Sequence, residues 1–200
     1  MKELKFKAIG ITPLLIHNNR TANPLNRYAQ ILKILNAKGK NKTDQDHKDV
    51  ARIEWEAGLY LHDGVVAIPG RCIDAMLFKS AKKTRNGPKY KEGTMIAEDY
   101  CQLDYRSPKI KIKENDHIPN PELDKFYDAT NFQAPVKINR SSTVIRTRPI
   151  FYDWSLEFTV IIDENILDER TVKDIAKTAG EYVGLCEDRP RKGRFEIELI

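Results

Sequence analysis

The last part of the chain alternates between strand and helix patterns, and it constrains the fold most. Apolar residues occupy nearly every second position from Trp154 to Ile162, which is typical of a half-buried strand. Asp168 then precedes an apolar stripe with helical spacing and predicts a helix cap. Gly184 lies where such a helix commonly ends, and residues 195–199 alternate again. The pattern predicts strand, helix and closing strand.

Similar patterns recur in the first half of the chain. Residues 2–11 alternate as a strand, and residues 65–68 form a short apolar strand. Pro69-Gly70 precedes a helical stripe over residues 71–83. Residues 25–35 also have helical spacing, and Thr43, followed by Asp46, predicts another helix start.

This order of elements indicates an α+β chain. Strand, helices, strand, strand, helix and strand match the ferredoxin-like split βαβ pattern, whose antiparallel sheet carries its helices on one face. We expect residues 1–200 to form a single domain of this type. Five prolines punctuate residues 86–141, so that stretch is expected to be a large, irregular insertion.

Charge and cysteine content narrow the class of protein. The net charge is +5, and the stretch from Arg71 to Lys113 holds 11 basic and 5 acidic residues, which favours a polyanionic partner.

Three cysteines without a CxxC pair argue against a disulfide framework or a cysteine-rich zinc site, and we expect neither metal nor cofactor. No apolar run is long enough to span a bilayer and the start carries no signal-peptide pattern, so we expect a cytoplasmic protein.

The clearest candidate site is the loop between Gly184 and the closing strand. Glycines at both ends let the backbone turn tightly and approach a ligand closely. Guanidinium groups are planar donors suited to phosphate oxygens. The candidate phosphate ligands here are Arg189, Arg191, Lys192 and Arg194. The alternative is a basic surface turn before an edge strand.

Two further groups of cations are candidates for the same role. Arg146 and Arg148 share one face of a predicted strand, and Arg140 precedes them among Asn, Ser and Thr donors. We expect Arg146 and Arg148 to contribute to one groove with Arg189 and Arg191. The alternative is that they are solvated arginines. The second group is Lys79, Lys82, Lys83 and Arg85. Lysines in a last helical turn are also explained by the helix dipole, without a ligand.

Evidence for catalysis is limited to one residue. The four histidines are scattered, and no phosphate-binding glycine loop or nucleophile motif is present. His17 follows the first strand and is the one candidate general base. The alternative is a polar loop histidine.

The chain resembles the RAMP superfamily, the ferredoxin-like RNA-binding subunits of CRISPR effector complexes. The resemblance rests on the glycine-bounded loop from Gly184 to Gly193 and on the segment Ile68-Pro69-Gly70-Arg71-Cys72-Ile73. It rests also on the insertion over residues 86–141, which follows the helix that this segment opens and which the resemblance implies is thumb-like. It implies binding of single-stranded RNA within an assembly. The chain departs from the family pattern in two ways, because the loop has only two glycines and the chain is short for a filament-forming subunit. It also resembles small phage-encoded proteins.

We therefore expect a non-catalytic protein that binds single-stranded nucleic acid, RNA rather than DNA, through backbone phosphates. It could form homo-oligomers or join other effector subunits. One alternative, implied by the resemblance, is a metal-independent endoribonuclease that uses His17. Another is a phage protein that acts on a host defence complex. No membrane partner is expected.

Overall fold

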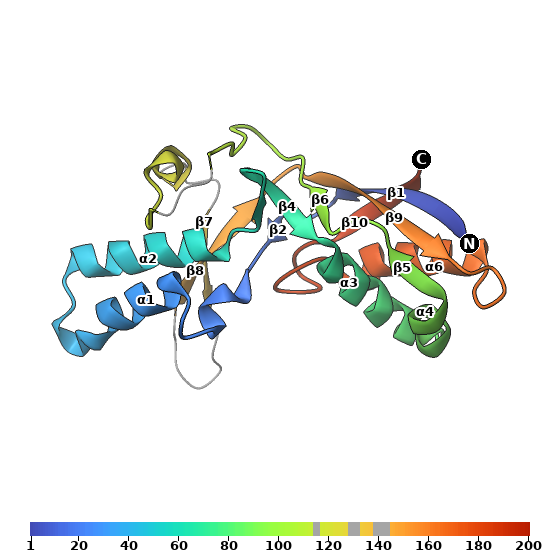
Figure 1. Cartoon of the computed structure of the whole chain (residues 1–200), viewed down its shortest axis with the longest axis horizontal. Coiled ribbons are helices and arrows are strands. Elements are labelled where there is room, and N and C mark those ends of the chain that lie inside the picture. The colour runs from blue at the N-terminus through green and yellow to red at the C-terminus, as the bar shows by residue number, and fades with distance from the viewer. Residues whose placement is uncertain (114–116, 128–132, 138–144) are drawn as a thin grey trace. The chain divides into compact units, whose positions relative to one another are not determined.

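The computed structural model describes residues 1–113, 117–127, 133–137 and 145–200. The chain forms two compact units, each assembled from segments that are distant in the sequence (Figure 1). Unit 1 comprises Met1–Leu15, Val66–Lys109 and Phe151–Ile200. Unit 2 comprises Ile16–Val65 and Ile110–Ile150.

An antiparallel sheet of four strands forms the centre of unit 1. The strands are β1 (Lys2–Gly10), β5 (Thr94–Ile96), β9 (Ser155–Ile162) and β10 (Phe195–Leu199). They lie in the order β10-β1-β9-β5, and each neighbouring pair is antiparallel. The first and last strands of the chain are therefore neighbours.

Two helices of unit 1 lie on the same side of this sheet, as Figure 1 shows. They are α3 (Gly70–Lys83) and α6 (Glu169–Thr178), which continues into a π-helical turn at Ala179–Val183. The hydroxyl of Ser80 on α3 donates a hydrogen bond to the carbonyl of Ile175 on α6, with 2.7 Å between the oxygens. Because both groups are buried, this bond also satisfies polar atoms that water cannot reach.

The period-2 pattern of β1 and β9 decides which face of the sheet is buried. Phe6 and Phe158 face each other in the register, and their rings stack with centroids 5.5 Å apart. Burying each such side chain contributes roughly 1.5–3 kcal/mol. The opposite face is charged, and Lys5 there forms an exposed ion pair with Glu157. The charged residues of β1 and β9 therefore lie on the solvent face, as the alternation in the sequence predicts.

The rest of unit 1 consists of short elements. They are β2 (Leu14–Leu15), β4 (Val65–Pro69, which begins at the last residue of unit 2), α4 (Gly87–Gly93) and β6 (Tyr100–Gln102). β4 pairs with β6 in antiparallel fashion. α4 packs against α3 through the buried Tyr90, whose hydroxyl donates to Asp74 at 3.0 Å.

Unit 2 is built around two helices, α1 (Arg27–Ala37) and α2 (Asp44–Gly58), which pack against each other. Its other elements are β3 (Leu61–His62), α5 (Asp124–Tyr127), β7 (Gln133–Lys137), β8 (Ile145–Phe151, which ends one residue into unit 1) and 3-10 turns at Asn19–Ala22, Gly39–Asn41 and Pro121–Leu123. β7 and β8 are antiparallel. Thr43 and Asp46 form the predicted capping box at the start of α2.

The α+β class and most predicted elements are confirmed, but the expected insertion over residues 86–141 needs correction. Its first part is regular structure in unit 1, where β5 is an edge strand of the main sheet. Residues 110–141 belong instead to unit 2. β5 has only three residues, too few for alternation to be visible in the sequence. Two apolar positions in the predicted helical stripe and closing strand are exposed, Tyr182 at 62% and Leu199 at 47%.

Candidate nucleic-acid interface

The loop between Gly184 and β10 is closed at its base by backbone hydrogen bonds. The amide of Leu185 donates to the carbonyl of Gly193 at 2.8 Å. The amide of Gly193 donates to the carbonyl of Pro13 at 2.9 Å. The amide of Glu187 donates to the carbonyl of Leu15, also at 2.9 Å. The loop is therefore anchored to the segment after β1 rather than held only at its two ends.

Glycine is required at both ends of this loop. Gly193 has φ +69°, and a Cβ there would lie 2.1 Å from the carbonyl oxygen of Leu185. Gly184 has φ +78°, and a Cβ there would lie 2.7 Å from the carbonyl oxygen of Lys192. Positive φ disfavours any side chain, and these contacts exclude one sterically. The two glycines therefore allow the two ends of the loop to pack closely against each other.

The cations of the loop are open to solvent. Arg189, Arg191 and Arg194 are exposed, and Lys192 is half-buried. Within the part of the chain that the structure describes, no carboxylate lies within ion-pair distance of any of these four side chains. None of the described acids therefore neutralises these charges, and the four side chains can meet an external anion.

The two motifs that carry the family resemblance meet in space. The thiols of Cys72, in the first turn of α3, and Cys186, at the start of the loop, share a hydrogen bond. This bond, together with burial, raises the pKa of Cys186 well above its usual value. Arg71, next to Cys72, is exposed and has no ion pair among the described residues. The cationic loop therefore begins beside another unpaired arginine.

A cavity of about 520 Å³ opens at the same end of α3. Arg71 lines it together with the exposed side chains of Met95 and Tyr100. Asp74, Glu98 and Asp99 also lie in its wall. The cavity thus combines an apolar surface with hydrogen-bond acceptors.

A second cationic region lies at the other end of α3. Lys79, Lys82, Lys83 and Arg85 are all exposed, and none has an ion pair within the described residues. The ammonium of Lys82 lies 4.3 Å from the ring centroid of Phe78. At 1.5 Å per residue, Lys82 is about 15 Å along the helix axis from Cys72. This lysine patch (Lys79, Lys82, Lys83 and Arg85) is therefore separate from the loop.

Arg146 and Arg148 are not free surface cations. Arg146 is ion-paired with Glu54, a carboxylate that is 5% exposed, and Arg148 is itself only 7% exposed. The other oxygen of Glu54 accepts from the amide of Thr147 at 2.9 Å. Glu54 on α2 thus binds two neighbouring residues of β8, and Arg146 serves a contact within unit 2. Arg140 lies outside the described residues.

The four arginines expected to share one groove belong to different units. Arg189 and Arg191 are in unit 1, and Arg146 and Arg148 are in unit 2. Their convergence on one strand of nucleic acid stays a prediction.

His17 lines a cavity of about 270 Å³ within unit 2, together with Lys33, Glu54, Arg146 and Arg148. Burial, and then the charge of Arg148, lower the pKa of His17 to about 4. Its Nδ1 is buried and has no hydrogen-bond partner among the residues that the structure describes, while the hydroxyl of Tyr60 donates to its backbone carbonyl at 2.9 Å. The imidazole is therefore neutral at pH 7. The juxtaposition with β8 has no local sequence signal, because His17 and Arg148 are far apart in the chain.

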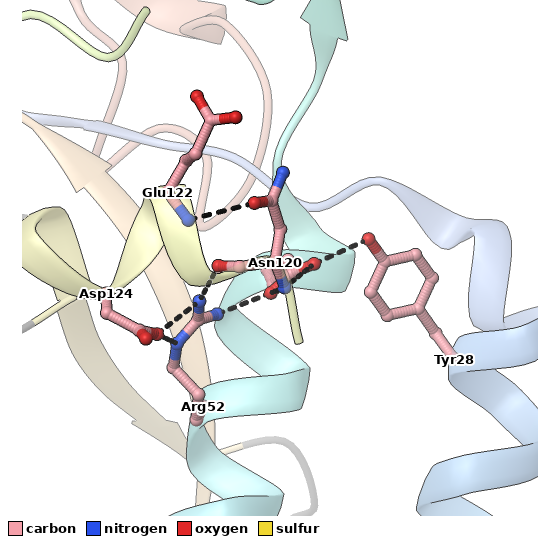
Figure 2. A network of polar contacts seen from close by, with 6 residues as sticks. Tyr28, Arg52, Asn120, Glu122 and Asp124 are labelled. Atoms are coloured by element: carbon pink, nitrogen blue, oxygen red, sulfur yellow. Dashed lines mark hydrogen bonds and ion pairs between the residues drawn. The ribbon is translucent and has the colours of Figure 1, made fainter. Parts of the chain in front are cut away.

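A buried polar network in unit 2 was not anticipated from the sequence (Figure 2). Arg52 donates to Glu56 at 2.6 Å, to Asp124 at 3.0 Å and to the carbonyl of Asn120 at 2.9 Å. Glu56 also accepts from the hydroxyl of Tyr28 at 2.9 Å and from the amide of Asn120. Its carboxylate oxygens are fully used inside the protein, so the network holds α1 and the 120–124 segment to α2 rather than forming a reactive site. The Arg52–Glu56 spacing of four residues was its one sequence signal.

The structure offers no metal centre within its described residues, where no group of three or more histidine, cysteine or acidic side chains comes together. None of the described helices combines the length and apolar character needed to cross a bilayer. In comparisons with known proteins, no family model matches this chain, and no curated protein has a significantly similar sequence.

Proposed function

We propose that this protein binds single-stranded nucleic acid, RNA in preference to DNA, through backbone phosphates and without chemistry of its own. The observation that supports this most is the cationic loop after Gly184. It offers Arg189, Arg191, Lys192 and Arg194 without carboxylate partners among the described residues. A strand of phosphates is the ligand that such a row of fixed donors suits best.

The proposal includes a ferredoxin-like core in unit 1. The sheet order β10-β1-β9-β5, with α3 between β1 and β5 in the chain and α6 between β9 and β10, supports a split βαβ arrangement. The RAMP resemblance remains part of this proposal, and it is what favours RNA over DNA. Fold alone carries no function, so the argument for binding rests on the loop.

The surfaces of unit 1 indicate how a strand would be held. The exposed sheet face carries ion-paired charges such as Lys5 and Glu157 instead of aromatic rings, so bases are not expected to stack there. The loop and Arg71 would bind phosphates, and the neighbouring cavity presents Tyr100 and Met95 to a base. The lysine patch would extend the contact along the backbone as a second region.

Binding of a labelled single-stranded RNA, measured by fluorescence anisotropy at several salt concentrations, tests the proposal. Each lost phosphate contact lowers the log–log salt slope by about 0.7, so the Arg189→Gln/Arg191→Gln variant should lower it by about 1.4. The matched control is Lys2→Gln/Lys5→Gln, which removes the same charge from side chains already paired with Glu164, Glu169 and Glu157. Equal slopes for the two variants, or wild-type binding weaker than about 10⁻⁴ M at low salt, would reject phosphate recognition by the loop.

The structure does not favour the alternative in which His17 is the general base of a ribonuclease. A base is most effective when its pKa lies near the working pH, and the pKa of His17 is lowered to about 4. In the described part of the chain, its Nδ1 has no partner that would orient the ring. Incubation of hairpin RNA with wild type and His17→Ala in EDTA should leave the RNA intact in both cases. Cleavage by the wild type alone would restore the catalytic alternative.

A further inference from the structure

We propose that the cavity at the start of α3 in unit 1 is a guanine-selective base pocket, in which the carboxylate of Asp99 accepts two neighbouring N–H donors of the base. This inference deepens the proposed function and rests on it, because it states which base a bound strand presents at this point. Asp99 lines the cavity together with residues from α3, β5 and β6.

Strand pairing and a glycine fix the wall that carries Asp99. Pro69, the last residue of β4, pairs with Tyr100 of β6. The amide of Gly70 donates to the carbonyl of Asp99 at 2.8 Å. A Cβ at Gly70 would lie 2.1 Å from the carbonyl oxygen of Glu98, so only glycine lets this segment approach α3 so closely. The backbone of Asp99 is therefore held in place beside the cavity.

The carboxylates of the cavity have unused acceptor oxygens. Asp74 accepts from the hydroxyl of Tyr90 through Oδ1 at 3.0 Å. Glu98 accepts from the amide of Thr159 through Oε2 at 2.8 Å. Asp99 is exposed, and neither of its side-chain oxygens has a hydrogen bond or an ion pair among the described residues. A carboxylate with both oxygens unused can accept two parallel N–H bonds.

Guanine is the base whose Watson–Crick edge matches such a pair of acceptors. It presents two neighbouring donors, N1–H and N2–H. The same edge of adenine, cytosine or uracil places a donor beside an acceptor, so one carboxylate oxygen would face another lone pair. In a single strand this edge is not engaged in base pairing and can enter a protein pocket. Asp99 is therefore expected to select guanine.

The rest of the lining suits the ring and the phosphate of the same nucleotide. The volume of about 520 Å³ falls within the roughly 300–1,000 Å³ typical of small-molecule sites. Met95 and Tyr100 are 55% and 40% exposed and offer apolar surface to the base. Arg71 is exposed, has no ion pair among the described residues and can hold the phosphate. The three carboxylates repel phosphate, so the base is the part of the nucleotide that they accept.

The cavity adjoins the cationic loop. Cys72, next to Arg71, shares a thiol hydrogen bond with Cys186 at the start of that loop. A strand whose phosphates are held by the loop can therefore place a base in the cavity.

Fluorescence anisotropy with labelled oligouridine strands, each carrying one substituted position, tests the selectivity. The strand with one guanine should bind at least about tenfold more tightly than strands with adenine, cytosine or uracil there. Inosine lacks the N2 amino group and should lose the preference, whereas 7-deazaguanine keeps both donors and should retain it. Equal affinities for the four natural bases would overturn the proposal.

Two variants with the same change of charge assign the preference to one carboxylate. Asp99→Asn replaces an acceptor by a donor and should abolish the preference for guanine. The matched control is Asp174→Asn, at an exposed position on α6, which should retain it. Arg189→Gln/Arg191→Gln should weaken binding of all four strands alike and leave their ratio unchanged. A preference that survives Asp99→Asn would reject the role of this residue.

Binding of free nucleotides tests the pocket even if no strand binds. The chain has three methionines, and with ¹³C-labelled methionine methyl groups the NMR signal of Met95 is identified by Met95→Leu. Guanosine 5′-monophosphate should shift this signal at concentrations about tenfold lower than the adenosine, cytidine or uridine monophosphates. A selective shift without strand binding would reject the proposed function and support the pocket. No selective shift at about 10 mM, or a shift with spermidine alone, which would indicate a cation site, overturns the inference.

Discussion

The thiol of Cys186, which opens the cationic loop, is hydrogen-bonded to the thiol of Cys72 in the first turn of α3. This contact joins two segments that the sequence separates by most of unit 1. It also protects Cys186 chemically, because the contact raises the pKa of this thiol and the thiolate rather than the thiol reacts with electrophiles.

Slow thiol modification is the expected consequence. The hydrogen bond and burial raise the pKa of Cys186, and burial raises that of Cys101 to about 12. At pH 8 both should react with an aromatic disulfide reagent at least about a hundredfold more slowly in the native than in the unfolded protein. Stopped-flow absorbance with Cys186→Ser and Cys101→Ser assigns the phases. Reaction of all three thiols at the unfolded rate would show that the contact does not persist in solution.

Removing Glu56 should strongly destabilise the protein. Glu56→Ala leaves the guanidinium of Arg52 buried, with the exposed Asp124 as its one remaining acid partner among the described residues, so the free energy of unfolding should fall by about 3–5 kcal/mol. Glu157→Ala removes an exposed pair with Lys5 and should change stability by less than about 1 kcal/mol. Chemical denaturation measures both. The Arg52→Met/Glu56→Met double variant should lose less unfolding free energy than the Arg52→Met and Glu56→Met variants lose in sum. Strict additivity of the two losses would contradict a coupled pair.

Replacing Gly193 should disturb the loop more than its backbone angle alone explains. Gly193→Ala meets the carbonyl oxygen of Leu185 at 2.1 Å, whereas Gly39→Ala has a similar φ of +54° and nothing within 4 Å. The Gly39 variant should lose about 1 kcal/mol and the Gly193 variant distinctly more. We also expect faster hydrogen exchange of the Leu185 amide only in the Gly193 variant. Similar losses in both would mean that the loop can relax without harm.

Stability should fall as the pH is lowered from about 6.5 to about 4, because of His17. The folded protein holds the pKa of His17 near 4 while the unfolded chain takes up a proton near 6.5, so protons favour the unfolded state in that window. The loss amounts to roughly 3 kcal/mol and is complete below pH 4. Denaturation of His17→Gln should lack this slope, whereas His47→Gln, at an exposed position on α2, should retain it. Asp46 and Glu169, whose pKa values are lowered to about 2 by their hydrogen bonds, lose their contributions only at lower pH.

The capping and alternation signals were reliable because they act within a few residues. Asp168 accepts from the amide of Thr171 at 2.9 Å as expected of a cap, and Gly184 ends its helix with a positive φ. The alternation of β9 appears in its burial pattern. β5 and α4 were missed because strands and helices of three to seven residues show too little periodicity. For the candidate site, residue types identified the cationic loop but could not tell that Arg146 is ion-paired.

The sequence by itself determined the α+β class, the main strands and helices, and the presence of a glycine-closed cationic loop. These features follow from backbone preferences and from the spacing of apolar side chains, which neighbouring residues specify. Only the tertiary structure decided which charges are neutralised. In the folded protein Arg148 is buried beside His17, and Arg146 forms an ion pair with Glu54. Arg189 and Arg191 have no acid partner among the described residues. Pairing and burial depend on which distant segments pack together, and a charge count contains no such information.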